Sequence, residues 1–193
     1  MENIRIGLIG YGEVGKTFAL GLKSQPGVAA CAAWDIKFVS AEVRGAELAH
    51  ATQGGIMACT SMLELCQASD LIISAVTASN TLAVAQEASR HLRPGTTFLD
   101  LNSASPSTKQ QCAALIDACG GAYVEAGVMT SVPPYGIRVP MLLGGAQAAA
   151  LSLQLTAWGM DAKVVSERLG VASAIKMCRS VMIKGLEAMV IES

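Results

Sequence analysis

The sequence predicts an α/β fold built on a doubly wound, mostly parallel sheet that is followed by a long helix. Short apolar runs alternate with helical patterns as far as about Val165, which is typical of successive βα units. A glycine-rich turn follows the first apolar run directly, as at the passage from a strand into a helix. The last segment, Leu169 to Ser193, has apolar residues three or four positions apart, which is the period of a helix.

The first strand and its turn are Ile4 to Gly15, IRIGLIGYGEVG, in which a GxGxxG pattern opens a helix from about Val14 to Lys23. Gly10 permits the tight turn, Gly12 lets a pyrophosphate approach the backbone, and Gly15 lets the helix pack closely on the strand. The helix would direct its free N–H groups and the positive end of its dipole at the phosphates. The same pattern occurs in ordinary strand-to-helix turns, so its context decides.

The second strand, Val28 to Trp34, supplies that context because it ends on Asp35. An acid about 20 residues past the last motif glycine accepts hydrogen bonds from a cofactor ribose, so a Rossmann-type domain that binds NAD or NADP is predicted. Asp35 would repel a 2′-phosphate and favours NAD, although Lys37 could reach such a phosphate. The predicted cofactor-binding residues are Gly10, Tyr11, Gly12, Glu13, Val14, Gly15, Asp35, Val76 and Thr77.

The remaining strands are short apolar runs between helical patterns. They are expected at Gly55–Ala58, Leu71–Val76, Thr97–Leu101, Ala122–Ala126, Pro140–Gly144 and Ala162–Val165. Ser61 and Ser105 to Ser107 stand where helix N-caps belong, and Pro94-Gly95 marks a turn. These signals predict a dinucleotide-binding domain over residues 1–165, followed by the start of an interdomain helix and a second domain over 166–193.

Composition excludes several classes of partner. The chain has 193 residues, of which 52% are hydrophobic and 15% charged, and its net charge of −1 includes no basic block for nucleic acid. No apolar run reaches the roughly 18 residues of a membrane span and no signal peptide opens the chain, so a cytoplasmic protein is expected. Six cysteines without a CxxC pair, and two histidines, predict reduced, mostly buried thiols and no metal site.

Polar residues follow the predicted strands where a parallel sheet binds its ligands, outside the carboxyl ends of the strands. They occur in Val76–Asn80, in Asp100–Pro106 and in Glu125–Ser131. On the final helix Lys176, Ser180 and Lys184 are four residues apart and share one face, with Arg179 beside it. A solvated basic stripe is the alternative interpretation of that face.

Four motifs in order, GLIGYGEVG, DLNSASP, EAGVMTS before MLLGG, and GVASAIKMCRS, resemble the β-hydroxyacid dehydrogenase superfamily, which includes 6-phosphogluconate and 3-hydroxyisobutyrate dehydrogenases. The resemblance covers essentially the whole chain and implies a nicotinamide domain whose last helix leads into an all-helical domain that is largely absent here. No Gly or Pro cap follows Ser193, so the chain is expected to stop inside a longer helix. The resemblance also implies that Lys176 is the acid/base residue.

The substrate residues implied by the resemblance depart from the family pattern in places. Asp100, Asn102 and Ser103 correspond to its DxST element, with asparagine in place of the usual serine. The Ser-Gly-Gly that holds a substrate carboxylate aligns with Met129, Thr130 and Ser131, and the asparagine four residues after the lysine is Ser180. The phrase SAIKMCRS is closer to a less characterised branch of NAD(P)-dependent oxidoreductases.

The function expected from these features is hydride transfer between nicotinamide and a small hydroxy acid or related alcohol, with Lys176 as general acid and base. For this the pKa of Lys176 must fall by a few units from about 10.4, through burial and the neighbouring Arg179. Ser103 could bind substrate or only cap a helix. An imine reductase-like enzyme and a non-catalytic nicotinamide-binding sensor are the alternatives. A homodimer through the final helix and the missing helical domain is also expected.

Overall fold

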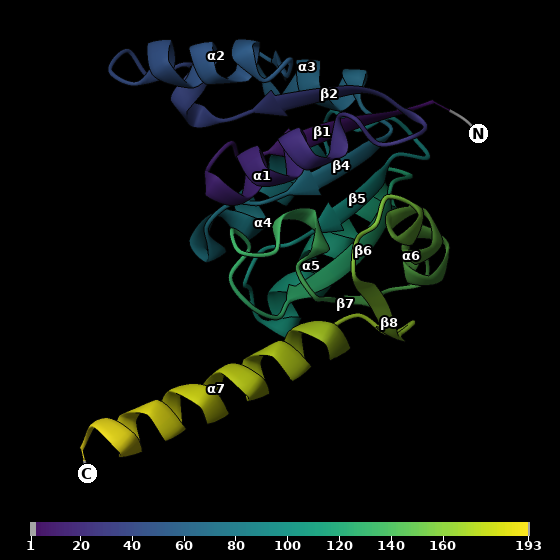
Figure 1. The fold of residues 1–193 in the computed structure, drawn as a ribbon. Helices are drawn as coiled ribbons and strands as arrows, with labels where there is room; N and C mark the ends of the chain where they lie inside the picture. The colour runs from purple at the N-terminus through teal and green to yellow at the C-terminus, as the bar shows by residue number, and fades with distance from the viewer. Residues whose placement is uncertain (1–2, 193) are drawn as a thin grey trace.

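The computed structural model describes residues 3–192, and there eight strands form one sheet in the order β3-β2-β1-β4-β5-β6-β7-β8 (Figure 1). Every neighbouring pair is parallel except β6 and β7. The predicted doubly wound, mostly parallel sheet is therefore confirmed. The strands are β1 (Ile4–Ile9), β2 (Val28–Trp34), β3 (Met57–Ala58), β4 (Leu71–Ser74), β5 (Thr97–Asp100), β6 (Ala122–Val128), β7 (Met141–Gly144) and β8 (Ala162–Ser166).

Helices cover both faces of the sheet and create two apolar cores. Residues of α1, α2 and α6 pack in one core, and residues of α3, α4 and α5 pack in the other. Successive strand residues point to opposite faces, so Leu8 enters the first core and Ile9 the second. The helices are α1 (Glu13–Leu22), α2 (Arg44–Gln53), α3 (Met62–Ala68), α4 (Thr81–Ala88), α5 (Pro106–Ala118), α6 (Ala148–Ala157) and α7 (Val171–Ile191), with short 3-10 turns η1 (Ile36–Phe38), η2 (Ala78–Asn80) and η3 (Gly136–Arg138).

Local signals in the sequence predicted several boundaries correctly. Ser61 caps α3 and Ser105 caps α5, and each hydroxyl accepts a hydrogen bond from the backbone N–H three residues further along.

Strand β4 ends two residues before its expected end at Val76, because the Val76 N–H donates to the side chain of Asn102 instead of to a neighbouring strand. All six cysteines are free thiols, four of them buried.

The connection between β6 and β7 explains the reversed pair. A return to a parallel strand needs a crossover, usually a helix, whereas residues 129–140 hold only the short turn η3. This segment packs on α1, where a side chain on Gly21 would overlap Ile137. The carboxyl ends of β1, β4, β5 and β6 therefore meet at one edge of the sheet, and the segment after β6 returns along that edge toward α1.

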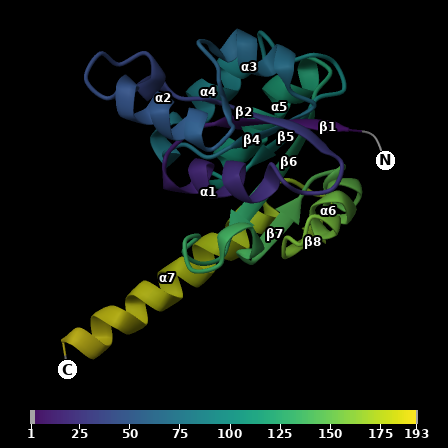
Figure 2. The same cartoon turned by 45° about the horizontal axis from the view of Figure 1, so that its top comes forward.

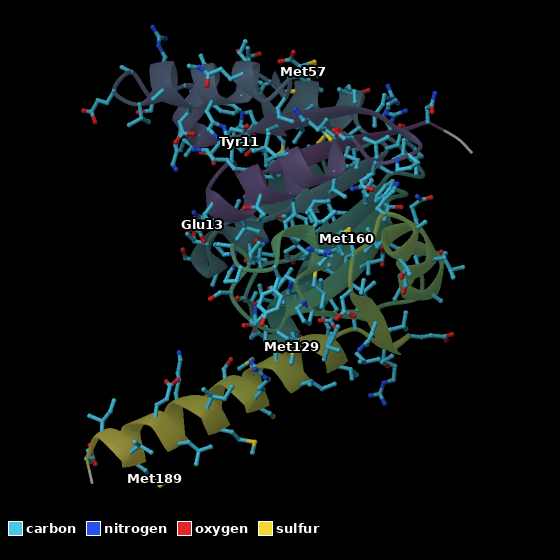
Figure 3. All side chains as sticks on the ribbon, in the orientation of Figure 1. Tyr11, Glu13, Met57, Met129, Met160 and Met189 are labelled. Atoms are coloured by element: carbon cyan, nitrogen blue, oxygen red, sulfur yellow. The ribbon has the colours of Figure 1, made fainter. Side chains whose placement is uncertain are left out.

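Helix α7 confirms the long final helix, whose predicted end at Ser193 lies outside the described residues. Its first turn is buried through Ala172 and Ser173, and the rest extends away from the body (Figures 1 and 2). Figure 3 shows Met189 on the extended part and Met129 near the place where the helix meets the body. Among residues 3–192, no helix has the length and apolar character that would let it cross a membrane.

Candidate active site

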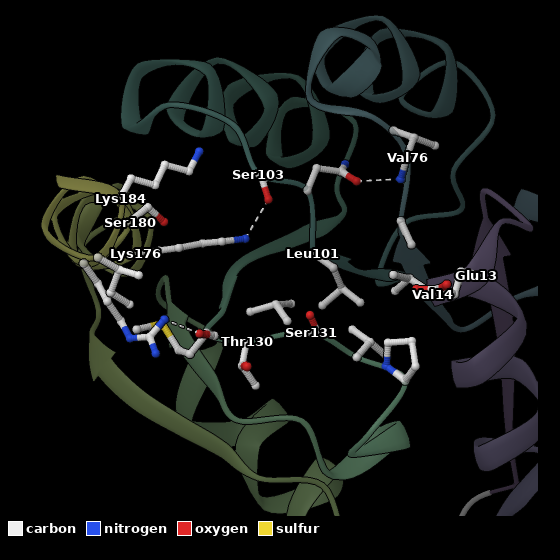
Figure 4. Close-up of a pocket in the computed structure, with 18 of the residues that line it drawn as sticks. Glu13, Val14, Val76, Leu101, Ser103, Thr130, Ser131, Lys176, Ser180 and Lys184 are labelled. Atoms are coloured by element: carbon white, nitrogen blue, oxygen red, sulfur yellow. Dashed lines mark hydrogen bonds between the residues drawn. The ribbon is translucent and has the colours of Figure 1, made fainter. Parts of the chain in front are cut away.

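A cavity of about 590 Å³ lies between the start of α1, the loops after β4, β5 and β6, and one face of α7 (Figure 4). Residues far apart in the sequence meet there because their strands end at the same edge of the sheet. The predicted site residues that line the cavity are Glu13, Val14, Val76, Asn102, Ser103, Met129, Thr130, Ser131, Lys176 and Ser180.

The glycine turn has the geometry that a dinucleotide requires. Gly10 has a φ of 93°, a conformation that favours glycine, and a side chain on it would overlap the carbonyl of Ala75. A side chain on Gly15 would overlap the carbonyl of Gly10, so only glycine lets α1 pack this closely. A side chain on Gly12 would meet no atom within 4 Å. That open space, beside the first N–H groups of α1, suits the approach of a pyrophosphate.

The other predicted cofactor residues lie outside the lining of the cavity. Tyr11 turns its ring into the core, where its hydroxyl lies 3.1 Å from His50 Nδ1, and its N–H donates to Asp35 Oδ2 at 2.6 Å. Asp35 Oδ1 accepts the N–H of Lys37 at 2.9 Å. The Asp35 carboxylate is thereby fixed after β2, beside the glycine turn. Thr77 is exposed, and its hydroxyl lies 3.2 Å from that of Ser79.

Lys176 extends from α7 into the cavity, and its Nζ donates to Ser103 Oγ at 2.6 Å (Figure 4). The helix can lie close to the sheet here because Gly127 of β6 has no side chain; a Cβ there would come within 2.9 Å of the Ala172 carbonyl. Ser105, and not Ser103, caps α5, so the Ser103 hydroxyl remains exposed to the cavity.

The pKa of Lys176 lies below its usual value. Burial is the main cause, the positive charge of Lys109 adds to it, and the negative charge of Asp100 opposes it. Of the two causes expected, burial is confirmed, but the cation that adds to it is Lys109 and not Arg179. Arg179 donates from Nη1 to the Met129 carbonyl at 2.5 Å. That bond fixes the start of the segment after β6 against α7.

Asn102 joins the ends of two strands. Its Oδ1 accepts the Val76 N–H at 2.6 Å, and its Nδ2 donates to Ser74 Oγ at 3.0 Å. Only 4% of the residue is exposed, so its amide is occupied by protein groups while the residue forms part of the cavity wall. The neighbouring Ser103 is thereby presented toward Lys176.

The sequence reasoning gave no role to two buried charged residues at this site, Glu125, which it placed only in a polar stretch, and Lys109. Glu125 of β6 caps α7: its Oε1 accepts the N–H groups of Gly170 and Ala172, and its Oε2 accepts the Ser173 hydroxyl. Lys109 of α5 is fully buried and pairs with Asp100. Each had a signal, because a charged residue interrupts an apolar pattern: Glu125 within a strand, and Lys109 on the helix face that carries Cys112, Ala113 and Ile116.

Comparison with known proteins identifies the group to which this architecture is similar. Residues 5–154 match the family described as the NAD binding domain of 6-phosphogluconate dehydrogenase. An uncharacterized 28.5 kDa protein of Methanothermus fervidus is 29% identical over 189 residues, which are 98% of this chain and 69% of that protein.

Two solved structures are similar over almost the entire chain. A conserved hypothetical protein from Sinorhizobium meliloti 1021 is 38% identical with a TM-score of 0.89, and the match covers 98% of this chain and 63% of that one. A conserved protein of unknown function, described as structurally similar to 3-hydroxyacid dehydrogenases, is 30% identical with a TM-score of 0.81 over 98% of this chain and 68% of that one. The chain thus spans about two thirds of the length of these relatives.

Proposed function

The chain belongs to the family of the NAD-binding domain of 6-phosphogluconate dehydrogenase, and we propose that it is the cofactor-binding part of an oxidoreductase in which Lys176 is the general acid and base. The proposed reaction interconverts a small hydroxy acid, or a related alcohol, and its carbonyl compound. The observation that carries the proposal is that the amine of Lys176 lies 2.6 Å from Ser103 Oγ, in a cavity that the start of α1 also lines.

The residues of the glycine turn fit a nicotinamide dinucleotide. The open space at Gly12 and the first N–H groups of α1 would hold its pyrophosphate, and Val76 lines the same cavity as Lys176. When bound, the nicotinamide supplies the acceptor or donor of a hydride. The protein supplies position and proton transfer.

Lys176 would exchange a proton with the substrate hydroxyl. A lowered pKa increases the fraction of neutral amine near pH 7, and only the neutral amine can accept that proton. Ser103, Thr130 and Ser131 offer hydroxyl groups in the same cavity that could orient the substrate. The position of Lys176 in the cavity supports an enzyme over a sensor that only binds cofactor.

The experiment that tests this role is Lys176→Met, assayed in the full-length protein with a panel of small 3-hydroxy acids. Methionine keeps a similar length, so the fold should survive. Turnover should fall by about 10² to 10⁴ while the affinity for the cofactor is almost unchanged, because backbone N–H groups hold the pyrophosphate. Lys163→Met, at an exposed lysine of β8 outside the cavity, is the matched control. Wild-type turnover in the Lys176 variant would exclude Lys176 as the acid/base.

We further propose that NAD is preferred over NADP. Asp35 stands after β2, where the cofactor ribose binds in this fold, and its charge would repel a 2′-phosphate. The ammonium of Lys37, which could otherwise meet that phosphate, lies 3.7 Å from Glu47 Oε1. Calorimetric titration with NADH and NADPH tests the preference. Tighter binding of NADPH would refute it.

A homodimer through α7 is part of the same proposal. Met182, Leu186 and Met189 are each more than half exposed on this helix, and helices with apolar faces of this kind are usually covered by another domain or subunit. Sedimentation tests the dimer: the wild-type protein should sediment as a dimer, and Met182→Glu, which places a charge on the apolar face, should weaken it. A wild-type protein that remains monomeric at high concentration would contradict the dimer.

A further inference from the structure

A buried group of three polar side chains lies beneath the cavity. Lys109 Nζ donates to the Asp100 carbonyl at 2.9 Å and lies 2.9 Å from Asp100 Oδ1, and Tyr123 Oη donates to Asp100 Oδ2 at 2.5 Å. Lys109 is fully buried, and Asp100 and Tyr123 are at most 3% exposed. Desolvation and the adjacent carboxylate hold the pKa of the Tyr123 phenol far above its usual value, so it remains a donor.

This group is connected to the catalytic amine through the turn that follows β5. Asp100 Oδ1 also accepts a hydrogen bond from the backbone N–H of Asn102 at 2.8 Å. This hydrogen bond fixes the backbone at the start of the turn. The turn then presents Ser103, whose hydroxyl accepts the hydrogen bond from Lys176. A short chain of polar contacts therefore runs from Lys109 through Asp100 and the turn to Lys176.

We propose, on the basis of the function proposed above, that Lys109 is a positioning residue for Lys176, which it serves through Asp100 and the turn that presents Ser103. An apolar residue would complete the face of α5 at a lower desolvation cost, since buried ion pairs are often no more stable than apolar replacements. A lysine does two things there that an apolar residue cannot: it binds the carbonyl at the end of β5, and it places a cation beneath the site.

The charge of Lys109 acts on Lys176 among several other charged groups. Asp100 opposes it from β5, Glu125 of β6 is occupied in capping α7, and Glu13 of α1 lines the far side of the cavity. Arg179, Lys184 and Glu187 line the cavity from α7 itself. Of these groups, Lys109 lowers the pKa of Lys176 and Asp100 raises it, and the effect of Lys109 is the larger.

The test measures the pKa of Lys176 directly, from the pH dependence of its acetylation by a trace of acetic anhydride, with the labelled peptide quantified by mass spectrometry. Lys109→Met should raise this pKa toward the usual value for lysine, because the cation is lost while the carboxylate remains. Lys109→Arg retains the charge and should restore the wild-type value. Lys163→Met removes an exposed lysine of β8 and is the matched control that should leave the value unchanged.

A buried lysine exchanged for methionine leaves Asp100 unpaired, so the folding of each variant is checked by circular dichroism. If Lys109→Met does not fold, Lys109→Met combined with Asp100→Leu removes both charges and should raise the pKa of Lys176 by a smaller amount, because Lys109 has the larger effect of the two. An unchanged or lower pKa in a folded variant would overturn the proposal. Labelling needs no substrate, so this result is independent of whether the proposed reaction is found.

Discussion

Lys176 owes its lowered pKa mainly to the burial of its amine, although the helix that carries it is mostly exposed. The direction of this pKa shift determines how the rate of the proposed reaction should depend on pH. In the proposed reaction, Lys176 accepts a proton from a substrate hydroxyl only as the neutral amine, so the rate of oxidation should rise with pH and level off above the pKa of Lys176. Because that pKa lies below the usual value for lysine, the rise should occur at lower pH than for an exposed lysine.

Gly12 offers a prediction that separates cofactor binding from folding. Gly12→Ala should leave the melting temperature almost unchanged, because the added methyl group meets no protein atom within 4 Å and the backbone φ of −78° suits alanine. The methyl group would instead occupy the space where a pyrophosphate approaches. The affinity for NADH should fall at least tenfold, about 1.4 kcal/mol. NADH fluorescence titration measures it.

Gly45→Ala is the control for this prediction, since Gly45 of α2 also has open space around it and lies away from the turn. This variant should bind NADH as the wild type does and be slightly more stable. Equal affinities for NADH in the two variants would show that the space at Gly12 is not used by the cofactor.

At the scale of elements, α7 is positioned by contacts at its first turn. Gly170 has a φ of 96°, and its N–H and that of Ala172 both donate to the buried Glu125. This carboxylate does what a capping side chain usually does, from a neighbouring strand instead of from the chain just before the helix. The direction of the helix, and with it the placement of Lys176, depends on that bond set and on the close approach at Gly127.

Glu125→Gln should therefore loosen the start of α7. The amide has one acceptor oxygen in place of two, so the Ser173 hydroxyl loses its carboxylate acceptor and keeps only the Gly170 carbonyl at 3.2 Å. The free energy of unfolding should fall by about 1 kcal/mol. Urea denaturation measures that loss, and hydrogen exchange at Ala172 should become faster. Glu167→Gln, on the exposed connection before α7, is the matched control. Identical stability of the two variants would contradict a capping role for Glu125.

At the scale of the whole molecule, Asp70 ties together segments from three parts of the chain. Its carboxylate accepts hydrogen bonds from the backbone and guanidinium of Arg5 on β1, and from Arg93 before β5, at 2.6 to 3.0 Å. The bonds from Arg5 are the main cause of a pKa well below the usual value for aspartate. The folded state therefore gains stability from Asp70 above the pKa of the unfolded chain, near 4, and loses it as the pH falls further.

Asp70→Asn should lower the free energy of unfolding at pH 7 by about 1 kcal/mol, a modest value because the side chain is 37% exposed and solvent screens the charges. The difference from the wild type should shrink as the pH is lowered from 5 to 3. Urea denaturation at several pH values measures this. Asp161→Asn serves as the control, since its lysine partner lies 3.8 Å away on the surface. A difference that stays constant with pH would show that the charge of Asp70 contributes nothing.

Much of the fold could be predicted from the sequence because its signals are local. The alternation of apolar runs and helical patterns predicted the sheet, the glycine turn predicted the start of α1, and Ser61 and Ser105 marked two helix starts. The antiparallel pair at β6 and β7 was not specified, because strand direction depends on the path of the connecting segment. The substrate-side residues could be named only through the resemblance to a family. Lys109 was missed, and Glu125 was noted only as part of a polar stretch, without its role at the start of α7.

The sequence by itself determined the elements of this protein, since hydrophobic period, caps and glycine turns act over a few residues. Tertiary structure decided which side chains meet. Lys176 and Ser103 are 73 positions apart in the sequence. Glu125 accepts a hydrogen bond from the backbone N–H of Gly170, which is 45 positions away. Such contacts follow from the order of strands in the sheet and from the close packing of α7 on β6, where burial also lowers the pKa of the amine. Burial and long-range contacts are properties of the packed chain, and no local pattern contains them.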